Sequence, residues 1–167
     1  MNTPITAHRR AERRGTHRAP DVVHGRVVVG VDGTPASVAA LAWALRAALD
    51  SGAELDVVTA WPDAGEVFVH EIPGHYCVPR GRAQEAQEAA LVATGAGDTR
   101  VPALRTHLDN THPVNALVEH ADGAGVLVVG ASHAHEGRRH VPVDQLCVLL
   151  ADCPVVVVED PEEESET

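Results

Sequence analysis

The feature that most constrains the fold of this sequence is a regular alternation of short valine-rich runs and longer segments with helical periodicity. The expected strands are residues 26–32, 54–61, 102–109, 125–130 and 154–158, and the expected helices are 35–51, 82–96, 111–121 and 142–152. Strands that alternate with helices pair in parallel through right-handed crossovers. The pattern therefore predicts the α/β class, with an open doubly wound five-stranded parallel sheet and helices on both faces.

The order of the strands follows from how apolar each run is. Residues 102–109 alternate Leu104 and Leu108 with polar residues, which is typical of an edge strand with one solvated face. The continuous apolar runs suit central strands that are buried on both faces. We therefore predict the order 3-2-1-4-5, in which the winding reverses between the first and fourth strands.

A ligand site is expected where the winding reverses, because open α/β sheets bind ligands outside the carboxyl ends of the strands at that point. Asp32 follows the first strand, and Gly130 and His133 follow the fourth. The loop after Gly130 carries His133, His135, Arg138, Arg139 and His140 in place of further glycines. The question is whether this loop holds a nucleotide, a metal ion or neither.

The chain of 167 residues is long enough for one domain with a real core. Hydrophobic residues make up 44% of it but aromatic residues only 2%, so the core must consist of Val, Leu and Ala. The last helix is expected to turn Val143, Leu146, Cys147 and Leu150 inward. We place the domain at residues 25–159, between a disordered Arg/His-rich tail at 1–24 and an acidic tail at 160–167.

Charge and cysteine content limit the partners and the compartment. The net charge of -11 argues against nucleic acid, because phosphate binding needs a basic face and the arginines concentrate in the N-terminal arm. Three cysteines without CxxC spacing do not form a disulfide framework. No apolar stretch is long enough to cross a bilayer, and we expect a cytoplasmic protein with reduced thiols. The complete absence of lysine is typical of a high-GC bacterium.

Four segments in order, VVVGVDGTPASVAALAWAL, GAELDVVTAW, ADGAGVLVVGASH and CPVVVV, resemble the universal stress protein family over roughly residues 26–159. The terminal VDQLCVLLADCPVVVV is the most specific part of this resemblance. The resemblance to this family implies a stress-response domain that dimerises through its last strand. No motif identifies the stress or a protein partner.

ATP-binding members of that family carry G-x2-G-x9-G-[ST] after the fourth strand, where backbone N–H groups close on phosphates. Gly130 matches the first glycine, and the second falls on His133. Aligning backward from Cys153 places the third glycine on Val141 and the Ser/Thr on Pro142, so the usual phosphate cradle is expected to be absent.

Two other positions carry over from the resemblance. Asp32 matches the family's nucleoside-contacting Asp, and Ala60 matches the second-strand residue whose backbone reads the base. Asp32 is equally suited to capping its own turn. Arg138 and Arg139 offer a second way to hold an anion, by side chains in place of the missing glycines.

Metal binding and catalysis are the remaining functions to consider. The loop histidines, with Asp32 nearby, are ligand types for zinc or nickel, but HxH without a cysteine or second carboxylate is a weak pattern and we expect no metal. Cys77 beside His75 is interpreted as a bystander, not a reactive thiol. The sequence contains no convincing nucleophile, base and oxyanion set, so we expect no enzyme activity and no required cofactor.

These observations lead to one main hypothesis and two alternatives. The chain is expected to be a homodimeric regulatory or protective stress-response domain with a degenerate nucleotide site. The first alternative is an ATP-binding universal stress protein that uses Asp32, Ala60 and a remodelled loop. The second is a metal-responsive binding protein.

Overall fold

The computed structural model of the protein describes residues 25–62, 70–98, 100–132 and 141–160. Its elements are β1 (Arg26–Gly30), α1 (Pro35–Ser51), β2 (Glu54–Trp61), α2 (Val78–Thr94), the 3-10 turn η2 (Ala96–Asp98), β3 (Leu104–Asn110), α3 (Pro113–His120), β4 (Val126–Gly130), α4 (Val143–Leu150) and β5 (Val155–Val158).

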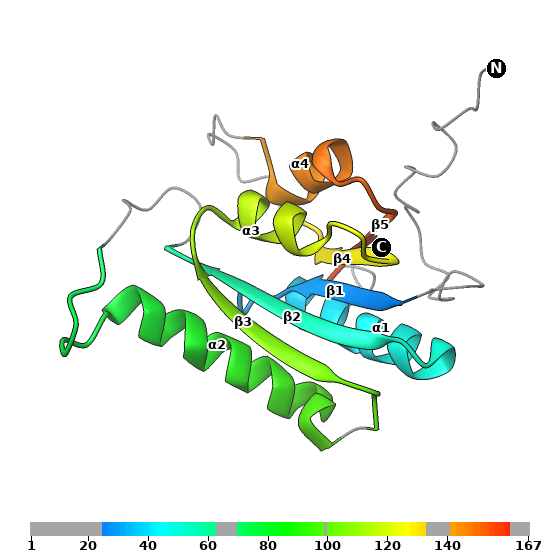
Figure 1. The fold of residues 1–167 in the computed structure, drawn as a ribbon, viewed down its shortest axis with the longest axis horizontal. Coiled ribbons are helices and arrows are strands. Elements are labelled where there is room, and N and C mark those ends of the chain that lie inside the picture. Colours follow the sequence, from blue (N-terminus) through cyan, green and yellow to red (C-terminus); the bar gives the residue numbers. More distant parts are fainter. Residues whose placement is uncertain (1–24, 63–69, 99, 133–140, 161–167) are drawn as a thin grey trace, which may run out of the picture.

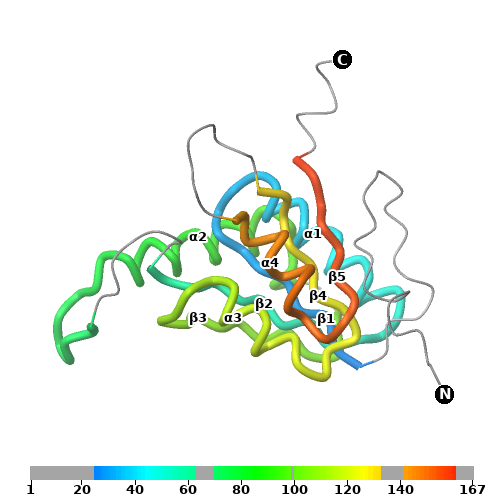
Figure 2. The backbone as a smooth tube through the Cα atoms, turned by 90° about the horizontal axis from the view of Figure 1, so that it is seen from above, coloured from blue at the N-terminus to red at the C-terminus, as the bar shows by residue number. Residues whose placement is uncertain are grey.

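The five strands form one sheet in the order β3-β2-β1-β4-β5, and all four neighbouring pairs are parallel (Figure 1). This confirms the predicted fold class and strand order. The register places Gly30 of β1 beside Val58 of β2, and Gly130 of β4 beside Val158 of β5. The backbone trace turns from α4 into β5 at the edge of the sheet beyond β4 (Figure 2).

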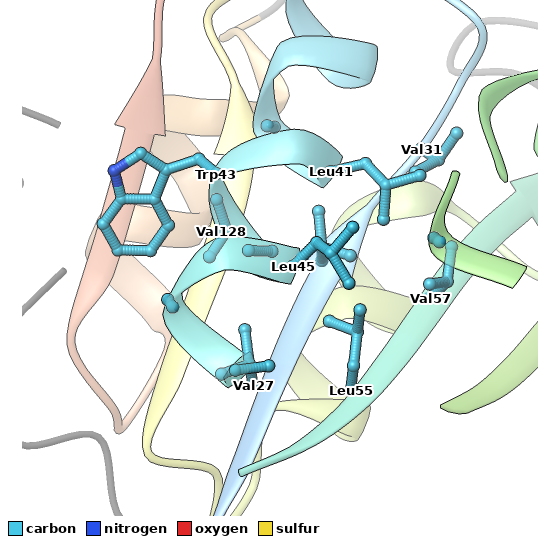
Figure 3. Close-up of a cluster of buried hydrophobic side chains, with 14 of the residues drawn as sticks. Val27, Val31, Leu41, Trp43, Leu45, Leu55, Val57 and Val128 are labelled. Carbon is cyan, nitrogen blue, oxygen red and sulfur yellow. The ribbon is translucent and has the colours of Figure 1, made fainter. Parts of the chain in front are cut away.

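Helices α1 and α2 cover one face of the sheet, and α3 and α4 cover the other (Figure 1). Because side chains alternate along a strand, Val27 and Val29 of β1 pack toward α1, whereas Val28 packs toward α3 and α4. The α1 side holds the larger core, which includes Leu41, Trp43 and Leu45 (Figure 3). Valine, leucine and alanine fill both layers, as the composition predicts.

The helix boundaries differ from the sequence prediction at α2. This helix begins at Val78, four residues before the predicted start at Arg82. The difference arises at Pro79, which sequence analysis assigned to the connecting loop. A proline fits the first turn of a helix, because its missing N–H has no partner there in any case. Cys77 is therefore the residue that precedes the helix.

Helix α4 is shorter and less buried than predicted. It ends at Leu150, and Cys147 is its one fully buried residue. The expectation that Leu150 points inward is wrong, since 54% of it is exposed, and Leu149 is 66% exposed. An eight-residue helix beside an edge strand has only a narrow strip of sheet to cover. Its outer leucines thus remain on the surface.

The predicted tail at 1–24, the histidines and arginines at 133–140, and residues 161–167 lie outside the described residues. Asp160, which sequence analysis assigned to the acidic tail, is described and is only 8% exposed. Within the described part of the chain, no helix has both the length and the apolar character that crossing a membrane requires.

Candidate functional site

The candidate site lies where the carboxyl ends of β1 and β4 adjoin. Strand β1 leads into α1 on one face of the sheet, and β4 leads toward α4 on the other, so the winding reverses between them. The described residues at this point include Asp32, Gly130, Ala131 and Ser132. Their placement agrees with the position predicted for a ligand site.

Asp32 is exposed and organises the turn between β1 and α1. Its Oδ1 accepts hydrogen bonds from the Thr34 backbone N–H at 3.0 Å and from the Thr34 hydroxyl at 2.6 Å. Thr34 Oγ1 in turn accepts from Ser37 N at 3.2 Å and so caps α1. The structure thus gives Asp32 the turn-capping role, while its exposure keeps the carboxylate open to solvent. Its contact with a nucleoside stays a prediction.

Gly130 lies against the first turn of α1 with no room for a side chain. A Cβ at this position would lie 2.7 Å from both the Ala36 carbonyl carbon and the Ser37 backbone nitrogen. Ser37 also accepts a hydrogen bond from the Asp32 backbone N–H at 3.3 Å. The fold therefore brings Gly130 and Asp32 together through Ser37. Close packing alone explains a glycine at this position, whatever the site binds.

We expect Gly130→Ala to destabilise the protein by about 1–3 kcal/mol without any nucleotide present, because the added methyl group meets helix backbone that cannot turn aside. Urea unfolding at fixed protein concentration measures the change. Gly97→Ala is the matched control, since a Cβ there has no atom within 4 Å. Equal free energies of unfolding for Gly130→Ala and the unmodified protein would contradict this packing account.

Ala60 lies near the carboxyl end of β2, and its backbone is directed toward the same site. The Val58 carbonyl accepts from Val31 N at 2.9 Å, so the polar groups of Val58 point toward β1. This direction repeats every second residue in a strand, and it therefore applies to Ala60. The last β1–β2 pair is Gly30 with Val58. The backbone polar groups of Ala60 therefore point to a place beyond the end of β1. That geometry suits a backbone contact with a ligand.

The start of α4 is poorly equipped to hold an anion. Pro142 precedes the helix, provides no N–H, and makes no side-chain capping bond. Asp144 lies in the first turn, and its Oδ1 is buried without a hydrogen-bond partner among the described residues. Asp144 is not among the predicted site residues, although the sequence shows an acid two residues after Pro142. Its carboxylate opposes an incoming phosphate at this helix end.

His133, the last of the predicted site residues, lies outside the described residues with the rest of its loop. The prediction that it takes the place of the second glycine is therefore not tested. Among the residues that the structure describes, no group of three or more His, Cys, Asp and Glu side chains is arranged to hold a metal ion.

Comparison with known proteins identifies the family of this chain. The sequence model of the universal stress protein family matches residues 24–159. The chain belongs to the universal stress protein family. Universal stress proteins of Mycobacterium tuberculosis and Mycobacterium bovis are each 36% identical to it over 145 residues, which cover 83% of this chain and 46% of theirs. The chain therefore spans about half the length of these relatives.

Solved structures of universal stress proteins share the fold. One, in complex with cAMP, is 27% identical, has a TM-score of 0.59, and is matched over 83% of this chain and 98% of its own. Another, from Archaeoglobus fulgidus in complex with dAMP, is 22% identical with a TM-score of 0.59, over 81% of this chain and 98% of its own. The family resemblance seen in the sequence is thus confirmed.

Proposed function

We propose that this universal stress protein is a homodimeric regulatory or protective module without enzymatic activity, whose site binds adenine nucleotides weakly and mainly through the nucleoside. The observation that carries this proposal is the start of α4, where Pro142 and Asp144 stand at the helix end that would face a phosphate. A helix N-terminus attracts anions through free N–H groups and its dipole. Pro142 removes one donor, and Asp144 already places a negative charge there.

The nucleoside end of the site is better preserved. Asp32 is exposed at the end of β1, and the backbone of Ala60 faces the same space. The 27% identical universal stress protein solved with cAMP supports an adenine nucleotide as the ligand class. The alternative, an ATP-binding protein with a remodelled loop, requires side chains at 133–140 to replace the backbone cradle. We favour nucleoside recognition, because the described residues supply it without that loop.

Calorimetric titration tests the proposal with a series of ligands of increasing charge. We expect adenosine, AMP, ADP and ATP to bind with similar dissociation constants of roughly 100 μM or weaker, because the phosphates add little binding free energy at α4.

Asp32→Asn should weaken binding about tenfold through loss of a charged contact, and Asp144→Asn should favour ATP over adenosine. Submicromolar ATP affinity, or stoichiometric ATP on the purified protein, would support the alternative. Unchanged affinity in Asp32→Asn would place the site elsewhere.

The absence of enzymatic activity is proposed from the chemistry near Asp32. Its carboxylate is hydrogen-bonded to the Thr34 hydroxyl and backbone, which is a helix-capping arrangement and not a nucleophile with its base. Within the described ranges, neither Asp32 nor Thr34 has a neighbouring His or Cys hydrogen bond that would activate it. We propose a cytoplasmic protein that acts through protein partners, without nucleic acid or membrane as a partner.

Dimerisation is proposed through β5, the edge strand next to β4. Val156 and Val157 are half-buried, and β5 presents one unpaired backbone edge in the described part of the chain. Exposed Leu149 and Leu150 lie on α4, the helix that precedes this strand. An uncovered apolar edge strand promotes aggregation unless another strand covers it. A twofold copy of β5 covers it by the same contact on both sides.

A further inference from the structure

A cluster of charged and titratable side chains lies away from the candidate site, on the side of β2 and β3 where α3 lies. Figure 1 shows how α3 is placed beside these two strands. Its members interact with one another across four elements of the fold: Arg26, Glu54, Asp56, Arg105, His107, Asp109 and His120. None of these residues is among the predicted site residues. The cluster contains a pair of histidines, His107 on β3 and His120 on α3, which we call the histidine pair.

The histidine pair joins the C-terminal end of α3 to the edge strand β3. The two ring centroids are 4.3 Å apart, with the planes tilted by 41°. His120 Nε2 lies 2.7 Å from Asp109 Oδ2, at hydrogen-bond distance. His107 Nε2 lies 3.8 Å from Asp56 Oδ2 and has no hydrogen-bond partner among the described residues. The His120 imidazole is therefore hydrogen-bonded to a carboxylate, whereas the His107 imidazole packs against the His120 ring and its Nε2 makes no hydrogen bond.

The surroundings of His107 disfavour a positive charge on its ring. Burial lowers the pKa of His107, the neighbouring His120 lowers it further, and Arg105 adds to the decrease. Asp56 and Asp109 act in the opposite direction but do not overcome this effect. Asp56 already accepts hydrogen bonds from Arg26 at 2.8 Å and from Arg105 at 3.3 Å. The positive charges of these two arginines offset the negative charge of Asp56, so Asp56 favours protonation of His107 only weakly.

Helix α3 connects this cluster to the candidate site. Leu117, one turn before His120, packs so closely on β1 that a Cβ on Gly30 would lie 2.9 Å from its Cδ2. Gly30 is the last residue of β1, two positions before Asp32. The helix that the histidine pair attaches to β3 therefore also contacts the end of β1 through Leu117.

We propose that the histidine pair is an acid-sensitive latch, which holds the end of α3 on β3 when His107 is neutral and loosens it when His107 is protonated. Two imidazolium rings at this separation repel each other, and Arg105 on the same strand adds to the repulsion. The groups that face the pair are Asp56 from β2, Arg105 and Asp109 from β3, and Arg26 from β1 through Asp56.

The sign of the pH effect follows from the lowered pKa of His107. The unfolded chain binds a proton at this residue below about pH 6.5, whereas the folded chain binds it only at lower pH. Folding therefore excludes a proton in that interval, and the stability contributed by neutral His107 is lost as the pH falls below about 6.5. Acidification in this window weakens the attachment of α3.

Hydrogen exchange on the intact protein tests the latch. We expect the protection factors of α3 amides to fall about tenfold between about pH 7.5 and pH 5, after correction for the intrinsic exchange rate, and to fall less in His107→Gln. His75→Gln is the matched control, because His75 is exposed in the segment before α2, and it should behave like the unmodified protein. An equal fall in His107→Gln and the unmodified protein would overturn the proposal.

A titration of the imidazole resonances keeps the test independent of any variant. We expect the His107 ring in the unmodified protein to titrate below about pH 6.5. A His107 midpoint at or above that of a solvated imidazole would overturn the latch, whatever the variants show. Neither measurement involves nucleotide, so its result is separate from that of the proposed function.

Discussion

Asp56→Ala is expected to reduce the free energy of unfolding by about 3 kcal/mol, at the low end of the range for breaking a buried ion pair. The Asp56 side chain is only 2% exposed, and it accepts hydrogen bonds from Arg26 and Arg105. Its removal leaves both guanidinium groups without their shared carboxylate. The loss is moderate because the arginines are 27% and 47% exposed and can turn to solvent.

The position of Asp56 explains why the loss of this one side chain is expected to destabilise the fold. It lies on β2 between Val28 of β1 and Arg105 of β3, so its two arginine partners come from the strands on either side. Arg26 also donates to the Asp122 carbonyl at 2.9 Å, in the loop after α3. Asp56 therefore holds three strands and one loop together at the amino ends of the sheet.

Glu54→Ala is the matched control for Asp56→Ala. Glu54 bonds the same Arg105 at 2.8 Å, but its side chain is 40% exposed, and solvent screening leaves such pairs with little effect on stability. Guanidinium unfolding at pH near 7.5 and constant protein concentration measures both variants. Equal losses would show that burial of Asp56 is not the cause of its effect.

The strand order could be predicted from the sequence because it depends on a strong signal, the contrast between continuous apolar runs and the alternation around Leu104 and Leu108. The order in turn located Asp32 and Gly130 at one end of the sheet. Both inferences depend on local pattern and on general rules for parallel sheets. The resemblance to universal stress proteins added the roles of individual residues.

Features that depend on contacts between distant segments could not be predicted in this way. The sequence gives no sign that Gly130 packs on Ala36, or that Asp56 is buried between two arginines. The inward prediction for Leu150 failed because helical periodicity defines an apolar face but does not reveal how much sheet lies beneath it. The same periodicity cannot tell whether a second chain covers that face.

We expect the unmodified protein to be a homodimer at micromolar concentration without nucleotide, and Val156→Lys to abolish the dimer. Val156 lies in the middle of β5, half-buried on the side of the sheet that α1 covers. A lysine there places a charge where two β5 strands would pair, so the variant should be monomeric or insoluble. Sedimentation equilibrium measures the change, and circular dichroism verifies that the monomer is folded.

Two further variants separate loss of the dimer from loss of the fold. Leu149→Glu alters a side chain that is 66% exposed, so it should weaken the dimer while leaving the protomer intact. Thr106→Lys changes an exposed position on β3, the opposite edge strand, and should leave the dimer unchanged. If the unmodified protein sediments as a monomer, β5 is not an interface. If Thr106→Lys dissociates the dimer and Leu149→Glu does not, the subunits associate through β3, and the exposed leucines of α4 need another explanation.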